Sequence, residues 1–136
     1  MSKRDAQELR AFLNQTPRTE RSRLLQLHTK MCAEGRELMV AKNHDYAGKD
    51  GDDPFANFRK SALINIDPRK GILLRLLDKI SRLNTFIEAG ELKVKDEQLI
   101  ETCIDGVNYF ILLAAMCQAD QRKRKEQNAG LATSTG

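Results

Sequence analysis

The sequence predicts an all-α protein, a bundle of three long and two shorter helices in a single domain. Apolar residues recur at spacings of three and four along most of the chain, which is the period of an α-helix and not of a strand. Because 136 residues are enough for one hydrophobic core, residues 1–125 are expected to form one domain. Residues 126–136 are rich in polar and small side chains and are expected to be a disordered tail.

Two helices are expected before residue 43. The first is short and carries its apolar residues between Leu9 and Leu13. Pro17 is placed to begin the second, longer helix. The apolar face of this longer helix consists of Leu24, His28, Met31, Gly35 and Leu38.

Residues 43–54 break the helical pattern, because they hold two glycines, four aspartates and a proline. A loop is therefore expected there. A short helix is expected to follow it, with Phe55, Phe58 and Leu63 on its apolar side.

Two long helices complete the predicted bundle. Asp67 and Pro68 suit the N-cap and the first turn of a helix that ends near Gly90. The last helix is expected to begin at Asp96 and to run to about Arg124, and it is apolar on every side near its middle. Such a helix needs cover all round. A homo-oligomer is the simplest source of that cover, and enclosure inside a monomer is the alternative.

The composition is typical of a soluble protein, with 40% hydrophobic and 31% charged residues. The longest apolar run, Tyr109 to Cys117, is half of the roughly 18–20 residues that a membrane span needs. The Met-Ser-Lys-Arg start lacks the apolar segment of a secretory signal. We therefore expect a cytoplasmic protein with no membrane partner, whose three cysteines pack in the core.

The net charge of +4 comes partly from a basic cluster at residues 122–125. Such a cluster can bind nucleic acid, and that binding would depend steeply on salt. It is more typical of a solvated helix end, where cations favour the helix C-terminus. Nucleic acid is therefore not the expected partner.

Acidic side chains run into the apolar face of the last helix. At about 100° per residue, Glu97, Glu101 and Asp105 fall on one stripe, together with Asn108. Buried carboxylates are costly unless they are paired, protonated or bound to a metal. A solvated helix start that enters the core one turn later is the alternative interpretation.

A divalent metal site is one hypothesis for these carboxylates. Asp78 and Arg82 lie away from the Leu/Ile face of the preceding helix, where alone they suit a surface ion pair. If that polar stripe faces Glu101 and Asp105, the two helices could hold a metal as other helix bundles do. Oxygen ligands without His or Cys favour Mg²⁺ or Mn²⁺. The remaining candidate ligands are Glu34 and Glu37.

Cations and aromatic residues flank the predicted loop. The cations could meet phosphates, and the aromatic rings could stack on a base. An acidic, solvated loop is the alternative. The residues concerned are Lys42, Asp45, Tyr46, Lys49, Asn57, Phe58, Arg59 and Lys60.

A metal-dependent phosphohydrolase of the HD type is a further alternative, since His28, the pair His44-Asp45 and the distant Asp105 supply its residue types. His28 lies on an apolar stripe, however, where a packed histidine is the more common case. We therefore prefer the carboxylate site.

Five short motifs occur in a fixed order along the chain: Lys42 to Gly48, Phe55 to Phe58, Asp78 to Leu83, Glu97, and Asp105 to Tyr109. In this order they resemble the phage and bacterial nucleotide-modification-associated domain family. This family belongs to the all-α nucleotide pyrophosphatase superfamily, which includes MazG and the dimeric dUTPases. The resemblance covers about Met31 to Cys117.

The resemblance implies a MazG-like, usually oligomeric enzyme that binds Mg²⁺ through helix carboxylates and cleaves a nucleoside triphosphate between its α and β phosphates. The superfamily pairs Glu-x-x-Glu on one helix with Glu-x-x-Asp on a later one. Glu34 and Glu37 match the first motif. Glu101 and Asp105 have three residues between them, and Thr102 stands where the ligand glutamate would be.

The expected function is therefore Mg²⁺-dependent hydrolysis of a (deoxy)nucleoside triphosphate or related nucleotide, in phage nucleotide metabolism in the host cytoplasm. Asp78, Glu101 and Asp105 would hold the metal. Glu97, Glu34 or Glu37 would complete its shell or orient water. Lys42, Lys79 and Arg82 would meet the phosphates. The sugar or base would contact Asp45, Tyr46, Asn57, Phe58, Asn108 and Tyr109.

The alternative function is a non-catalytic protein that binds or sequesters a nucleotide, or that contacts a host protein. The absence of a glutamate at Thr102 and the small size of the chain favour it.

Overall fold

A computed structural model of the protein describes residues 2–46, 53–89 and 96–134. Within these ranges every regular element is helical, so the predicted all-α class is confirmed. The long helices are α2 (Glu20–Tyr46), α4 (Pro68–Glu88) and α5 (Asp96–Ser134). The short elements are α1 (Lys3–Leu13), α3 (Ala56–Arg59) and the 3₁₀ helix η1 (Lys60–Ile64).

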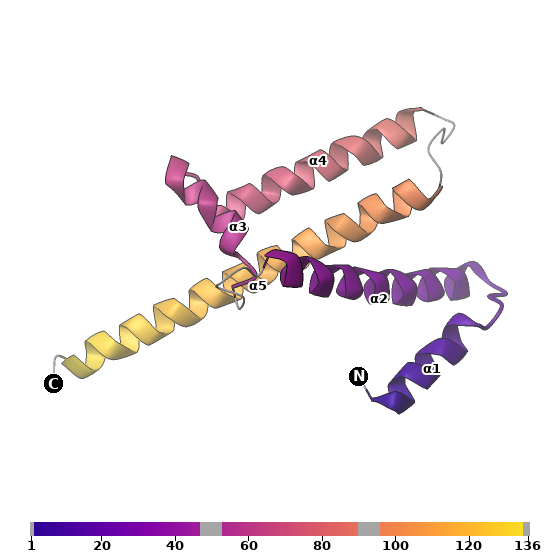
Figure 1. Ribbon diagram of the computed structural model, residues 1–136, viewed down its shortest axis with the longest axis horizontal. Coiled ribbons are helices and arrows are strands. Elements are labelled where there is room, and N and C mark those ends of the chain that lie inside the picture. The colour runs from indigo at the N-terminus through magenta and orange to yellow at the C-terminus, as the bar shows by residue number, and fades with distance from the viewer. Residues whose placement is uncertain (1, 47–52, 90–95, 135–136) are drawn as a thin grey trace.

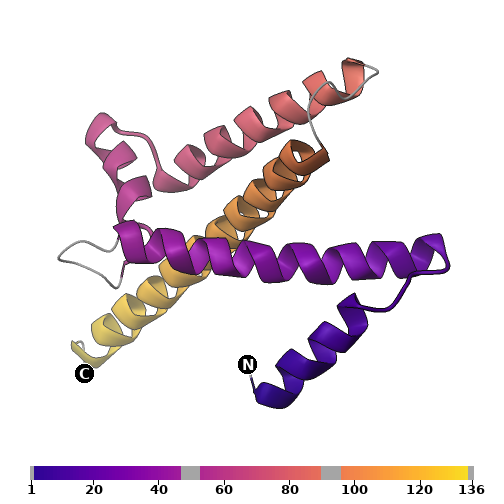
Figure 2. The ribbon, with the colours of Figure 1, turned by 45° about the vertical axis from the view of Figure 1, so that its right-hand side comes forward.

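The three long helices meet around the middle of α5 (Figure 1). Helix α4 runs antiparallel to α5 along one side, and α2 crosses α5 on another (Figure 2). The core lies where α3, α4 and α5 converge, and its buried members include Phe55, Ile72 and Met116. Helix α1 contributes no buried residue and packs against α2.

The first residues of α2 correct one sequence prediction. The helix begins after Thr19 and not at Pro17, because Thr19 and Ser22 cap it reciprocally. The backbone N–H of Ser22 donates to Thr19 Oγ1 at 3.1 Å, and the N–H of Thr19 donates to Ser22 Oγ at 3.0 Å. Two of the free donors at the helix start are thereby satisfied, which Pro17 could not achieve.

The start of α4 is as predicted. Asp67 is its N-cap and accepts a hydrogen bond from the backbone N–H of Arg69, while Pro68 occupies the first turn. The guanidinium of Arg69 also donates to the same carboxylate, and these hydrogen bonds lower the pKa of Asp67 to about 2. Arg69 lies 4.0 Å from Asp120, so the cap is also tied to α5.

Helix α5 is longer than predicted. Residues 126–134 were expected to be a disordered tail, but they continue the helix and are all exposed. The segment contains several good helix formers, namely glutamate, glutamine, leucine and two alanines. Extending an existing helix requires no new nucleus, so these residues can follow the basic cluster in helical form.

One helix among the described residues, Gln98–Ser134 within α5, is long and apolar enough to cross a membrane by length and composition alone. This is weak evidence for a span, because the core helix of a soluble protein passes the same test, and 17% of this window is buried inside the structure. The absence of a membrane partner stays a prediction.

Helices α2 and α5 are in close contact at Gly35. The Nδ2 of Asn108 donates to the backbone carbonyl of Gly35 at 3.0 Å, and both residues are buried. A Cβ atom at Gly35 would stand 3.0 Å from Asn108 Oδ1 and 3.5 Å from Ile104 Cγ2. Glycine is therefore required by the separation of the two helices.

We predict that Gly35→Ala destabilises the protein by about 1–2 kcal/mol, although alanine is the better helix former. Overpacking a tight contact costs ~1–3 kcal/mol, while the gain in helix propensity is at most ~1 kcal/mol. Asn108 cannot move aside without losing its hydrogen bond to Gly35. Urea unfolding followed by circular dichroism measures the change.

Gly71→Ala is the matched control. A Cβ atom at Gly71 would meet the Ser61 side chain at 3.5 Å, an ordinary contact, so this variant should be more stable by up to ~1 kcal/mol. Equal changes in the two variants would show that the α2–α5 contact does not require a glycine.

Candidate functional site

Three charged side chains from three long helices meet at the junction of the bundle. Lys79 Nζ of α4 lies 2.8 Å from Asp105 Oδ2 of α5. Lys42 Nζ of α2 lies 3.4 Å from Asp105 Oδ1. We call these three residues the lysine–aspartate cluster.

Helical spacing explains why Lys79 of α4 and Lys42 of α2 both lie on the faces that contact α5. Lys79 follows Leu76 by three residues and precedes Leu83 by four, so it lies on the stripe of α4 that faces α5. Lys42 follows Gly35 by seven residues, which is about two turns, and so lies on the face of α2 that contacts α5. The glycine contact and the ion pair therefore share one helix face.

The cluster is partly shielded from water. The side chains of Lys79, Asp105 and Lys42 are 16%, 25% and 48% exposed. Burial alone would raise the pKa of Asp105, but the hydrogen bond from Lys79 and the charges of both lysines outweigh it, so the pKa lies below its usual value. Asp105 is consequently ionised at neutral pH, and the cluster carries one net positive charge.

Aromatic residues of the expected nucleotide site lie beside this cluster. Tyr109 is one turn beyond Asp105 on α5, and its ring packs edge-on against Phe58 of α3, with centroids 6.3 Å apart. Both rings are half-buried against the Phe55 core. Asn57, also on α3, is exposed. Asn108 is used at the α2 contact described above.

The candidate metal ligands do not gather in the structure. Asp78 and Glu101 are exposed, and so are Glu34 and Glu37 on α2. Lys30 lies 3.8 Å from Glu34. Of the five carboxylates only Asp105 is in the cluster, and the described residues contain no group of three or more metal-ligating side chains.

Several other predicted site residues can also be placed. Arg82 is exposed on α4. His28 is exposed on α2, with its Nε2 3.8 Å from Cys32 Sγ, and is not packed in the core as its apolar stripe suggested. The side chains of Asp45, Tyr46 and Glu97 lie outside the described residues, as does that of His44.

Thr102 has a structural role in α5. Its side chain is buried, and its hydroxyl donates to the carbonyl of Gln98 at 2.8 Å. A glutamate could not occupy this space without moving the surrounding side chains.

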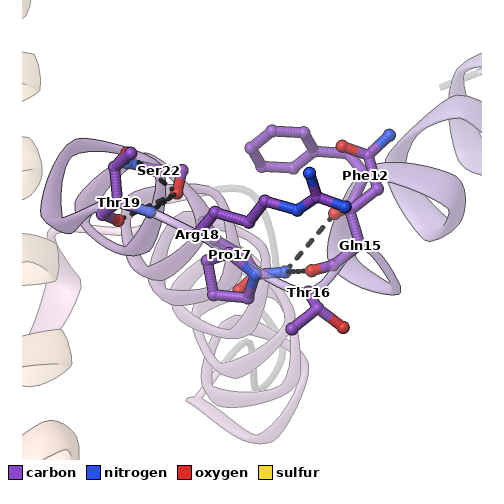
Figure 3. Close-up of a pocket in the computed structure, with 8 residues that line it drawn as sticks. Phe12, Gln15, Thr16, Pro17, Arg18, Thr19 and Ser22 are labelled. Atoms are coloured by element: carbon purple, nitrogen blue, oxygen red, sulfur yellow. Dashed lines mark hydrogen bonds between the residues drawn. The ribbon is translucent and has the colours of Figure 1, made fainter.

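A pocket of about 570 Å³ lies elsewhere, between α1 and the start of α2 (Figure 3). The side chain of Gln26 closes its base by donating to the carbonyls of Leu13 and Gln15. Arg18 is the one cation in its lining, which contains no carboxylate or histidine. This pocket lacks the residue types that phosphate hydrolysis requires.

Comparisons with protein-family models, with curated proteins and with solved structures found no match. A carboxylate between two ammonium groups can exchange one of them for a metal ion, and the released ammonium can then bind an anion.

We predict that Asp105→Asn lowers the free energy of unfolding by about 1–3 kcal/mol at neutral pH, because it leaves the poorly exposed Lys79 without its charged partner. The folded-state pKa of Asp105 is depressed, so its contribution is present above the unfolded pKa of about 3.9 and is lost as pH falls through the folded value. The difference between wild type and variant should shrink on acidification.

Urea titrations of both proteins at several pH values between neutral and strongly acidic measure this difference. A difference that does not change with pH would show that Asp105 is not paired with the lysines.

Proposed function

We propose that the protein binds a (deoxy)nucleoside triphosphate, or a related nucleotide, at the lysine–aspartate cluster and hydrolyses it to the monophosphate and pyrophosphate. The observation that supports this most is the convergence of Lys42 and Lys79, from separate helices, on one partly shielded point. Two ammonium groups at one point match the charge of a polyphosphate better than that of a single carboxylate. The proposed reaction follows from the superfamily that the motifs resemble.

The two lysines differ in a way that suits ligand exchange. Lys42 is about half exposed and its contact with Asp105 is long, so it can turn to a phosphate at little cost. Lys79 is more buried and closer to Asp105, so it holds the carboxylate in place. Tyr109 lies one turn beyond Asp105 on α5 and packs against Phe58, and the base or sugar would extend from the phosphates toward these rings.

Hydrolysis adds the oxygen of water to the α-phosphorus and releases the bridging oxygen with pyrophosphate. Because the lysines lower the pKa of Asp105, this carboxylate is a weak base at neutral pH. Its role in the proposed reaction is to orient the water or to hold a cation. Lys42 and Lys79 offset the negative charge that develops on the leaving pyrophosphate.

A cage of three carboxylates for Mg²⁺ does not fit the described residues, since Asp78 and Glu101 point to solvent. Mg²⁺ is often bound by only one or two carboxylates together with substrate phosphates and water. Asp105 fits that arrangement and would be the ligand from this chain. A bound Mg²⁺ or Mn²⁺ would supply neutralisation of the polyphosphate charge.

The second candidate function is nucleotide binding or sequestration without catalysis, or contact with a host protein. Two observations favour it. Asp105 already has its charge balanced by two lysines, and Thr102 is buried and hydrogen-bonded where the superfamily has a metal-binding glutamate. A cytoplasmic setting, expected from the composition, and a phage origin, implied by the sequence resemblance, are part of the same proposal.

We predict that the protein releases pyrophosphate from at least one nucleoside or deoxynucleoside triphosphate in the presence of Mg²⁺, and that Lys79→Gln lowers the rate by roughly 100-fold. Lys30→Gln is the matched control, because Lys30 is exposed on α2 and lies outside the cluster. Circular dichroism of each variant confirms that its helices are intact. No turnover with any nucleotide would exclude the hydrolase.

We also predict that the same nucleotide raises the melting temperature of the wild type and has a smaller effect on Lys42→Gln and Lys79→Gln. Stabilisation without pyrophosphate release would identify the non-catalytic module. Equal stabilisation of wild type and both variants would show that the nucleotide binds away from the cluster.

A further inference from the structure

The chain alone exposes far more surface than a compact protein of its size. Its accessible surface is 11176 Å². A compact monomer of 15.4 kDa would expose roughly 7,200 Å². The surplus is several times the roughly 800 Å² per partner that a stable protein interface buries.

Helix α4 exposes several large apolar side chains in addition to those it buries. Its inward stripe includes Ile72, Leu76 and Leu83 and faces α5. A second stripe lies about 90° further round the helix and is between 46% and 77% exposed. We call this second stripe the α4 seam; its residues are Leu73, Leu77, Ile80 and Ile87.

The spacing of the α4 seam is that of a helix-pairing surface. The steps from Leu73 to Leu77 and on to Ile80 are four and three residues, and Asn84 continues the same alternation to Ile87. Alternating steps of four and three residues place these side chains along one edge of the helix, as at the paired positions of a coiled coil. Coiled coils also often carry a single polar residue such as asparagine among their apolar core positions, as Asn84 does here.

Helix α5 adds to the same open face. Phe110 is 59% exposed and lies on the side of α5 roughly opposite Ile104 and Asn108, which contact α2. Helices α4 and α5 are both right-handed, and they run antiparallel. Because the inward stripe of α4 faces α5, the α4 seam and Phe110 both lie on the side of the α4–α5 pair away from α2. The two helices thus present one apolar face.

We propose that a second copy of this chain covers the face, with its α4 seam packed antiparallel against the first. The contact is a two-fold one, so each α4–α5 pair contributes half of a four-helix core. The ends of α4 carry complementary charge: Lys70 stands near its start and Glu88 near its end, both exposed. An antiparallel arrangement brings Lys70 of one copy toward the partner's Glu88, whereas a parallel arrangement would bring like charges together.

The mass of the full-length protein in detergent-free solution tests the proposal by sedimentation velocity. The wild type is expected at twice 15.4 kDa. Ile80→Asp should weaken the dimer by at least about tenfold, because it places a charge within the seam. Leu63→Asp is the matched control, since Leu63 is 86% exposed on η1 and outside the seam.

Two further variants test the geometry of the contact. Asn84→Leu should strengthen the dimer by removing a polar group from the seam. Lys70→Glu and Glu88→Lys should each weaken it by roughly two- to five-fold, and the double variant should restore the wild-type affinity. No restoration by the double variant would overturn the antiparallel arrangement.

Three results would overturn the proposed partner. The first is that the wild type stays monomeric at micromolar concentration. The second is that Ile80→Asp does not weaken the dimer. The third is that the wild type binds phospholipid vesicles through α5 and does not self-associate. The proposal is independent of nucleotide turnover, so failure of the proposed hydrolysis would leave it standing.

Discussion

The close contact between Gly35 and Asn108 is the constraint on which the rest of the structure depends. It is the point where the Asn108 side chain of α5 donates directly to the backbone of α2, with no α2 side chain in between. Since Lys42 is two turns along the same face of α2, the distance between α2 and α5 at Gly35 also sets the distance from Lys42 to Asp105. Wider separation at this contact would remove one of the two cations from the cluster.

The lysine–aspartate cluster then joins all three long helices through one side chain. Asp105 contacts α2 by one carboxylate oxygen and α4 by the other. Each pair alone would contribute little at an exposed position, but Lys79 and Asp105 are both shielded, so neither can lose its partner cheaply. A cluster with one surplus positive charge, held between helices, is suited to an anionic ligand that brings more than one oxygen.

The sequence predicted the positions of the helices well, but it did not predict which side chains contact each other between helices. The spacing of apolar residues predicted the three long helices, and Asp67 with Pro68 predicted where α4 begins. Periodicity identifies a buried face but not what covers it, so a carboxylate on such a face is equally compatible with a metal and with a lysine. Lys79 carried the missing signal, because it interrupts the inward stripe of α4 at helical spacing. The prediction of a metal site on Asp78 and Glu101 depended on how two helices face each other, and no local sequence pattern specifies that orientation.

The last turns of α5 are stabilised differently from the packed core. From Gln121 to Ser134 every residue is exposed, so this stretch draws its helicity from neighbouring turns and not from a packed interior. Such a stretch unwinds gradually from its end on heating, whereas the core is expected to unfold cooperatively. Far-ultraviolet circular dichroism will combine the two and broaden the apparent transition. The chain has no tryptophan, so the near-ultraviolet signal of Tyr109, packed against Phe58, is the natural optical probe of the interior.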